Sequence, residues 1–338
     1  MATTRRLRVS TFGITLAGFA AALIPTGIGQ AAPSSNLTLS QVQAQIAALN
    51  TKAEKITEAY NAARDNLVAL QRKEALTETE LSRDQSALTS SENKLASSAA
   101  AAYRSGGLDA TMSLVSSGSP QTFLDQTATL EEVAHYQANQ VAAADAAQRT
   151  LSADQVLHTA QVKQQTSTLA SITAQRNSIN GLLAQEKALL DRLTSAARAQ
   201  YDSAANAMAA RELSLRNSYN GPASGQAAAA VQFAYDQLGK PYVYGAAGPD
   251  SYDCSGLTMR SWEAAGVSLP HNAAEQQSAI PAVSLGALEP GDLVFFGSPA
   301  YHVGIYIGGG RMIAAPHTGT VVQIQDLSGY PPTSAGRP

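Results

Sequence analysis

The sequence predicts an α+β protein in which a long antiparallel helical hairpin, a coiled coil, precedes a domain built around an antiparallel sheet. Two contrasts in composition and one periodicity support this prediction. Residues 37–217 contain only four of the 25 glycines and one of the 14 prolines, and their apolar residues recur at helical spacing. Residues 226–338 hold 11 of the 19 aromatic residues, and about 113 residues suffice for one compact core. Helices first and strands after them are typical of the α+β class.

The chain begins with a segment typical of a secretory signal peptide. Three arginines among the first eight residues precede the apolar run 12–24, and small residues follow at 29–31. A run of 13 apolar residues is shorter than the roughly 20 that span a bilayer. We therefore expect residues 1–31 to be cleaved off through the general secretory route, which places the mature protein outside the cytoplasm.

Charge and cysteine content narrow the possible functions. Without the three N-terminal arginines, 20 basic side chains face 26 acidic ones, which argues against nucleic acid as a partner. Cysteine occurs once, at Cys254, so no intramolecular disulfide can form. From composition alone this cysteine is a small buried hydrophobe, a link to another chain or a reactive thiol.

The hairpin region, residues 37–217, carries two apolar seams at the spacing of helices that wrap around each other. Their members are Val42, Ile46, Leu49, Ala53, Ile56, Tyr60, Ala63, Leu67, Leu70, Leu81, Leu88 and Leu95 in the first, and Leu169, Ile172, Ile179, Leu183, Leu190 and Leu193 in the second. The Gly- and Ser-rich break at 103–121 predicts a short helical tip between two antiparallel helices.

Polar residues interrupt both seams, which predicts weak packing that can rearrange. They are Glu74, Thr77 and Asp84 in the first seam, and Arg176 and Glu186 in the second. His135 and His158 also lie in this region, and we expect both on the solvated surface of a helix because neither belongs to a cluster with metal-ligand spacing.

A linker at 218–225 leads into the C-terminal domain, residues 226–338. Gly239 ends its first predicted helix, and a second one runs from Cys254 to Gly266. Asn272 is the expected N-cap of a third helix, with Glu275 three residues later. The segments "GDLVFFG", "HVGIYIGGGRMIAA" and "VVQIQDL" read as strands, the second as a hairpin turning at 308–310.

Cys254 is placed to be a nucleophile, because a cysteine in the first turn of a helix faces the positive end of the helix dipole, which favours the thiolate. Its base must come from elsewhere in the fold. His302 opens a strand whose apolar residues alternate toward the core, so its own side chain points to the other face, beside the small Gly304. The residues alone leave two readings open: a Cys-His pair, or a buried cysteine and an unrelated histidine.

Four motifs in this order resemble the NlpC/P60 family of papain-like cell-wall peptidases: "GKPYVYGAAGPDSYDCSGLTMRSW", "LPHNAAEQQ", "LEPGDLVFF" and "HVGIYIGGGRMIAAPHTG". The resemblance covers about residues 229–325 and implies a papain-like fold. It also implies cleavage of peptidoglycan stem peptides, usually between γ-linked D-glutamate and meso-diaminopimelate, by a cysteine nucleophile and a histidine base. No metal or organic cofactor is implied.

The same resemblance assigns roles within the site. Cys254 is the implied nucleophile and His302 the implied base, while Tyr242 lines the site and helps to hold the scissile carbonyl. Asp253 and Ser255 flank the nucleophile, where the family uses them to meet the N-terminal side of the substrate. As caps of the Cys254 helix, both residues also have a purely structural explanation, and Tyr242 also has one as a core aromatic residue.

Two positions depart from the family pattern. Where the family places a polar residue twelve positions after the histidine to orient the imidazole, this chain has Ala314. His317, three residues later, is the candidate third member of the site, with an unrelated loop histidine as the alternative. His271 stands where the family often has arginine, and we expect it at the surface, at the entry to a helix.

Three functions remain open at this point. The first is a secreted, wall-associated endopeptidase for stem peptides, acting in wall remodelling or cell separation. The second is a non-catalytic wall scaffold or activator, and the third is a papain-like amidase for another amide bond. Septal hydrolases with such a helical arm imply a membrane or divisome activator. We expect the arm to fold back and inhibit the enzyme, with a simple spacer as the alternative.

Overall fold

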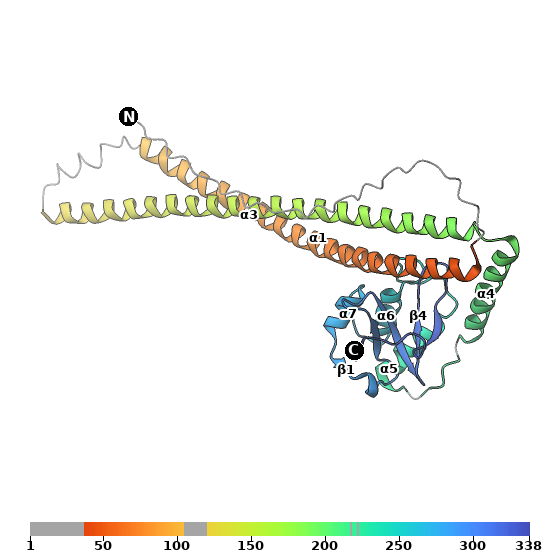
Figure 1. The fold of residues 1–338 in the computed structure, drawn as a ribbon. Helices are drawn as coiled ribbons and strands as arrows, with labels where there is room; N and C mark the ends of the chain where they lie inside the picture. Colours follow the sequence, from red (N-terminus) through yellow and green to blue (C-terminus); the bar gives the residue numbers. More distant parts are fainter. Residues whose placement is uncertain (1–36, 105–119, 217, 222) are drawn as a thin grey trace, which may run out of the picture. The chain divides into compact units, whose positions relative to one another are not determined.

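The computed structural model describes residues 37–104, 120–216, 218–221 and 223–338 (Figure 1). The predicted signal peptide and most of the predicted tip of the hairpin lie outside these residues. The α+β prediction is confirmed, because a pair of long helices is followed by a domain with an antiparallel sheet. In the described part of the chain, no helix is long and apolar enough to cross a membrane.

The hairpin consists of helices α1 (Leu39–Arg104) and α3 (Pro120–Leu190), which pack along each other in opposite directions. Ser98 near the end of α1 bonds Gln140, whereas Thr77 farther back bonds Gln161. Members of both seams are buried in this interface, as predicted, with Leu70 at 4% exposure and Ile179 at 1%. Leu169 is an exception and remains half exposed.

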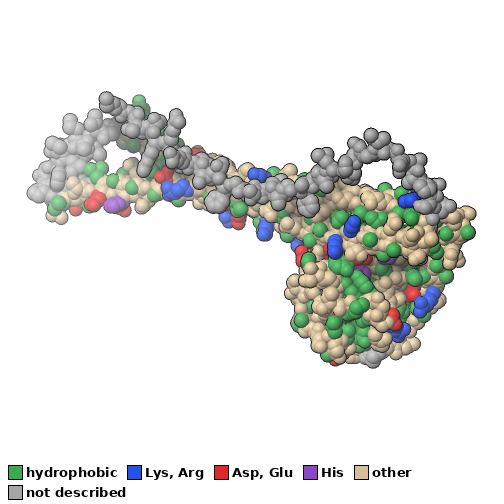
Figure 2. All heavy atoms as spheres, in the orientation of Figure 1, with side chains coloured by type: hydrophobic (Ala, Val, Ile, Leu, Met, Phe, Trp, Pro, Cys, Tyr) green, Lys and Arg blue, Asp and Glu red, His purple; other side chains and the backbone are tan. Residues whose placement is uncertain are grey.

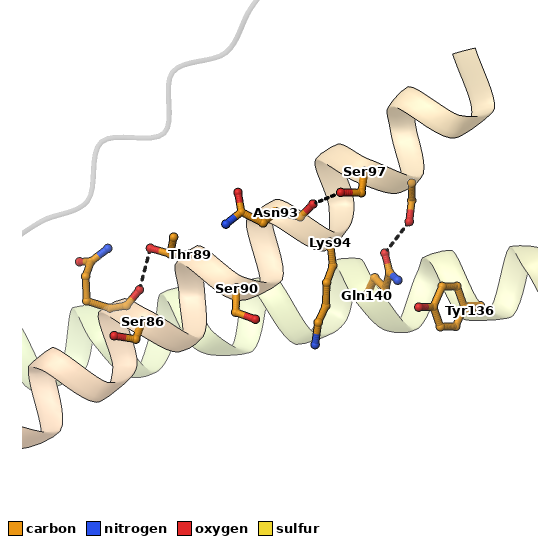
Figure 3. A pocket seen from close by; sticks show the side chains of 10 residues that line it. Ser86, Thr89, Ser90, Asn93, Lys94, Ser97, Tyr136 and Gln140 are labelled. Carbon is orange, nitrogen blue, oxygen red and sulfur yellow. Dashed lines mark hydrogen bonds between the residues drawn. The ribbon is translucent and has the colours of Figure 1, made fainter. Parts of the chain in front are cut away.

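The polar interruptions of the seams differ in burial: Thr77, Asp84 and Glu186 are buried, Glu74 is half-buried and Arg176 is exposed. Thr77 is buried and accepts a hydrogen bond from Gln161 at 3.1 Å, and Glu74 accepts one from Gln165. Farther along, α1 and α3 diverge around a groove of about 700 Å³ lined by small polar side chains such as Ser90 and Asn93 (Figure 3). Acidic and basic side chains are both scattered over the face drawn in Figure 2.

A third helix, α4 (Ser195–Ser214), follows the hairpin and packs on the C-terminal domain. Thr194 caps its first turn through the backbone N–H of Ala197. At its other end, the Glu212 carboxylate accepts a hydrogen bond from the backbone N–H of Ile324. Tyr219 then packs its ring 5.2 Å from that of Tyr235. The residues just before 226 therefore contribute to the core of the C-terminal domain.

The C-terminal domain combines helices with a six-stranded sheet whose strand order is β1-β6-β2-β3-β4-β5, all pairs being antiparallel. The helices are α5 (Gly225–Asp236), α6 (Cys254–Ala264), α7 (Ala273–Ala279) and the 3-10 turn η1 (Leu285–Ala287). The strands are β1 (Ala282–Val283), β2 (Leu293–Phe296), β3 (His302–Gly308), β4 (Arg311–Ala314), β5 (Gln323–Asp326) and β6 (Ser334–Gly336).

Alternation along β3 divides its side chains between the two faces of the sheet, as the sequence predicts. Val303 and Ile305 face the main core, which also holds Leu257 and Trp262 of α6. The second face carries a smaller cluster around Phe296. The predicted turn at 308–310 joins β3 to β4, and all three glycines have positive φ angles, a conformation that other residues rarely adopt.

Candidate active site

Asp253 determines where helix α6 begins and therefore where the thiol lies. Its side chain accepts a hydrogen bond from the backbone N–H of Gly256 at 2.7 Å, which caps the helix at Cys254. Gly256 is needed for close packing, because a Cβ atom there would lie 2.3 Å from the carbonyl oxygen of Ala246. Both the helical start at Cys254 and the capping role of Asp253 are as predicted.

His302 is the first residue of β3 and pairs with Phe296 across the sheet. Their rings lie 5.4 Å apart, and His302 is only 2% exposed. Its Nδ1 atom is buried without a hydrogen-bond partner in the described part of the protein. The imidazole is therefore fixed by packing rather than by a polar neighbour.

A second face of α1 lies over this site, and its residues are polar. We call this set the docking stripe: Asn50, Glu54, Thr57, Glu58 and Asn61. All five are buried, at 1% to 9% exposure, although they belong to a helix of the hairpin. Their spacing of three and four residues places them on one side of α1, apart from the apolar seam that faces α3.

Glu58 contacts Cys254, the predicted nucleophile, directly. Its Oε1 atom lies 3.3 Å from the Sγ atom of Cys254 and accepts a hydrogen bond from the Ser255 hydroxyl at 2.9 Å. Oε2 accepts one from the backbone N–H of Ala273, and the Glu58 backbone carbonyl accepts one from the Asn272 side chain at 2.7 Å. The thiol thus donates to a carboxyl group of α1 and not to an imidazole.

The next turns of α1 hold the residues around the nucleophile. Asn61 donates to the Asp253 carboxylate at 2.8 Å, and Asp65 accepts from the backbone N–H of His271 at 3.0 Å. Arg64 donates to the carbonyl oxygen of Gly245 at 3.0 Å. These bonds fix the register of α1 on the domain.

Two cavities remain on either side of the docked helix. One, of about 220 Å³, is lined by His302, His317 and Tyr330 of the domain and by Glu54 of the docking stripe. The other, of about 390 Å³, is lined by Asn272 and Tyr301 on the domain side and by Lys55 and Glu58 on α1. The docked helix therefore helps to line two hollows of the domain, one of which also contains His302.

The electrostatics of this arrangement keep the thiol and the imidazole neutral. Burial, followed by the charges of Glu58, Asp253 and Glu54, raises the pKa of Cys254 well above its usual value. Burial and the neighbouring His317 lower the pKa of His302 to about 3. Because a thiolate and an imidazolium are the reactive forms of such a pair, the docked state is not poised for attack.

Two predicted site residues remain, Tyr242 and His317. Tyr242 lies near Cys254, whereas His317 lies in the cavity of His302. Tyr242 is buried, and this burial, followed by the charge of the nearby Cys254, raises its pKa well above the usual value. His317 lines the cavity of His302, but its Nδ1 atom lies 2.8 Å from the Thr318 carbonyl oxygen and 2.9 Å from the Asn50 amide nitrogen. It does not bond His302, so its orienting role stays a prediction.

His271 corrects one expectation. It is not at the surface but 8% exposed, and its Nε2 atom lies 2.8 Å from Oδ1 of Asp253. Burial lowers its pKa, but the carboxylate of Asp253 more than offsets this, so the net shift is upward. The loop leading into α7 places His271 next to Asp253, beneath the start of helix α6. A single histidine in a loop gives no sequence signal for such a buried position.

His158 is the other corrected histidine. It is half-buried between α1 and α3, and its Nε2 atom lies 3.7 Å from Glu74 and 3.9 Å from Glu78. These three side chains form a group with ligand atoms within 4.8 Å of one another. The group lies in the hairpin and shares no residue with the site around Cys254.

The sequence analysis missed the docking stripe, although a signal for it was present. Polar residues at 50, 54, 57, 58 and 61 follow the same helical period as the apolar seam, on another face of the helix. Such a polar face is usually solvated. Only its complementarity to the C-terminal domain distinguishes it from ordinary surface.

A capped helix begins at Cys254, and His302 opens a strand of an antiparallel sheet. This arrangement is typical of a papain-like thiol hydrolase domain. Residues 239–334 match the model of the NlpC/P60 family. This part of the chain is an NlpC/P60 domain.

The relatives found are named as peptidases. A probable endopeptidase of Mycobacterium tuberculosis is 42% identical over 109 residues, covering 32% of this chain and 28% of that protein. A probable endopeptidase of Corynebacterium glutamicum is 39% identical over 116 residues, covering 34% of this chain and 56% of that protein. The p60 protein of Listeria grayi, also named a probable endopeptidase, is 49% identical over 94 residues, 27% of this chain and 18% of that protein.

The alignments therefore span between about a fifth and little more than half of these relatives. Among solved structures, the NlpC/p60 domain of the peptidoglycan hydrolase SagA is 36% identical, with a TM-score of 0.32. That comparison covers 33% of this chain and 98% of the SagA domain.

Proposed function

We propose that this protein is a peptidoglycan hydrolase, a cysteine endopeptidase that cleaves stem peptides. The observation that carries the proposal is the placement of Cys254 at the capped start of α6 within an NlpC/P60 domain that also contains His302. The names of the relatives agree with this activity. The proposed bond joins γ-linked D-glutamate to meso-diaminopimelate.

The chemistry uses residues of this chain only. The Cys254 thiol gives its proton to His302, and the thiolate sulfur attacks the scissile carbonyl carbon. His302 then protonates the leaving amine as the C–N bond breaks, which leaves a thioester on Cys254. A water molecule that gives a proton to His302 hydrolyses this thioester, releases the new carboxylic acid and restores the thiol.

The proposal includes a latent resting state. Support comes from the contacts of Glu58 and Asn61 with Cys254, Ser255 and Asp253, which leave the thiol 1% exposed. A substrate cannot reach the sulfur while α1 is docked. An activator at the membrane or divisome that binds the undocked form would shift the population toward the active enzyme.

The cellular setting follows from the same proposal. The enzyme is secreted through its predicted signal peptide, acts at the cell wall and contributes to wall remodelling or cell separation. Latency suits such a role, because uncontrolled cleavage of stem peptides weakens the wall.

The test is digestion of diaminopimelate-type muropeptides followed by mass analysis of the fragments. The full chain carrying Glu58→Ala and Asn61→Phe should release fragments, because the first change removes the bond to the thiol and the second forces a ring into a site that is 1% exposed. Adding Cys254→Ala should abolish the release. Cleavage that persists without the thiol, or no cleavage once the thiol is accessible, would contradict the proposal.

The alternatives make different predictions in the same experiment. A wall scaffold binds muropeptides without cutting them, and the unpartnered Nδ1 atom of His302 is the feature that favours this alternative. An amidase for another bond cuts at a different position, which the fragment masses identify.

A further inference from the structure

Asp253 is a fully buried carboxylate with five hydrogen-bond donors around it, the most distant being the Ser255 hydroxyl at 3.5 Å from Oδ1. Oδ1 accepts from the backbone N–H of Gly256 at 2.7 Å and lies 2.8 Å from Nε2 of His271. Oδ2 accepts from the backbone N–H of Gly245 at 2.8 Å and from the Asn61 side chain at 2.8 Å. Among the described residues, His271 is the one group in ion-pair distance that can carry a positive charge.

The carboxylate of Asp253 opposes the ionisation of its neighbour in sequence. Its negative charge contributes to the raised pKa of the Cys254 thiol, alongside burial and the charges of α1. The α1 charges leave with the helix, but Asp253 belongs to the domain and stays next to the nucleophile. A cation paired with Asp253 offsets this effect and favours the thiolate.

The pair of Asp253 and His271 lies entirely within the C-terminal domain. Undocking removes Asn61 from Asp253 and Asp65 from the backbone of His271, yet neither loss breaks the contact between carboxylate and imidazole. The acidic groups that act on His271 are Asp253 before α6 and, from α1, Glu58 and Asp65. After undocking, Asp253 is the one that remains.

We propose that His271 is a positioning residue for the nucleophile: as an imidazolium it pairs with Asp253 beneath helix α6, holds the cap of that helix and keeps Cys254 able to form a thiolate once α1 has left. The inference rests on the proposed function in one respect, that the thiolate of Cys254 is the attacking group. It also explains how histidine serves at a position where the resembled family often has arginine, since both side chains can carry the charge.

The single cysteine of the chain makes this inference measurable without a substrate. The alkylation rate of Cys254 by iodoacetamide is followed by mass against pH, in the full chain with Glu58→Ala and Asn61→Phe so that the thiol is accessible. In this background His271→Gln should raise the apparent pKa of the thiol and slow alkylation at pH 7 about tenfold. His271→Arg should keep the alkylation rate near that of the parent chain. Arginine should also retain its positive charge at high pH, where histidine loses it.

Equal pH profiles of the parent and His271→Gln would overturn the proposal, and so would a loss in His271→Arg as large as in His271→Gln. A second measurement needs no undocking. Titration of the five histidines of the unsubstituted full chain by NMR should show His271 protonated to higher pH than a free imidazole, and Asp253→Asn should lower its pKa. A pKa of His271 below that of a free imidazole would also overturn the proposal.

Failure of the proposed function would look different. If the thiol titrates as expected but no muropeptide is cut, the pairing of His271 with Asp253 stands and the peptidase activity does not. If muropeptides are cut while His271→Gln leaves the thiol unchanged, the activity stands and the positioning role does not.

Discussion

The carboxyl group of Glu58 lies 3.3 Å from the sulfur of Cys254, although 195 residues separate the two along the chain. This contact joins the helical hairpin to the predicted nucleophile of the NlpC/P60 domain. It places a hydrogen-bond acceptor where the thiol would otherwise meet a base or a substrate. The hairpin is therefore more than a spacer in this structure, because one of its faces covers the site.

Removal of the docking contacts should expose the thiol. We expect iodoacetamide to modify Cys254 at least tenfold faster in the full chain with Glu58→Ala and Asn61→Phe than in the unsubstituted chain, because the thiol is 1% exposed when α1 is docked. A matched control carries the same kinds of change at Glu92 and Asn66, which are exposed positions of the same helix. Similar rates in both variants would mean that helix disruption in general, and not loss of docking, exposes the cysteine.

Docking should weaken as the pH rises. Burial raises the pKa of Glu54 and Glu58 to about 8 each, aided by their mutual proximity for Glu54 and by Asp253 for Glu58. Because these values lie above the free value of 4.5, docking takes up protons, and the stabilisation present at low pH is lost as the pH rises toward 8. Each proton taken up changes the docking equilibrium by up to about tenfold per pH unit.

The measurement is Cys254 alkylation in the full chain between pH 5 and pH 8.5, corrected with the accessible variant described above. The double change Glu54→Gln and Glu58→Gln should flatten the pH dependence, because amides of the same shape do not titrate. A pH dependence that persists unchanged in the Gln variant would assign it to another group.

Release of the hairpin should activate the enzyme. We expect a chain of residues 195–338 to cleave soluble muropeptides faster than residues 32–338, because a docking free energy of about 3 kcal/mol leaves about 1% of molecules open. Equal initial rates would leave the hairpin as a spacer or docking arm.

The shorter chain 226–338 should be less stable than 195–338. It lacks the bond from Ile324 to Glu212 and the packing of Tyr219 on Tyr235. We expect a loss of about 2 kcal/mol in the free energy of unfolding, from one buried hydrogen bond and one half-buried aromatic contact. Urea unfolding of both chains measures it, and equal midpoints would show that these contacts add nothing.

His317 should matter for the rate if it orients His302 after undocking. Within the described residues, the Nδ1 atom of His302 lacks a partner, and undocking removes Asn50 from His317 in the shared cavity. In the accessible background, His317→Ala should lower kcat at least tenfold, about 1.4 kcal/mol, with little change in KM. An unchanged kcat would mean that His317 is a loop residue without a role in orienting His302.

Ala314→Glu also tests how well the His302 imidazole is oriented, by adding a polar side chain instead of removing one. Ala314 is fully buried in the cluster around Phe296, so the larger side chain should cost about 1–3 kcal/mol of stability. If the imidazole is poorly oriented, the new carboxylate should raise kcat despite this cost. No gain would mean that packing already orients the ring.

Local signals in the sequence were sufficient for the three helices and for strands β2 to β5 of the domain, but not for the short strands β1 and β6. The capping pattern at Asp253 and at Asn272, the glycine turn at 308–310 and the alternation along β3 each depend on neighbours within a few residues. Such short-range effects can be predicted because the backbone geometry of caps, turns and strands is the same in any protein.

A helical hairpin, an α+β domain and a cysteine at the start of a helix could be predicted from the sequence, because periodicity and capping are local. The three-dimensional fold alone establishes which polar face of α1 is buried, that Glu58 meets Cys254 and that His271 pairs with Asp253. These contacts join residues up to 267 positions apart, as for Asn50 and His317. A buried polar group and a solvated one look alike in sequence, because what separates them is the partner that the fold brings within hydrogen-bond distance.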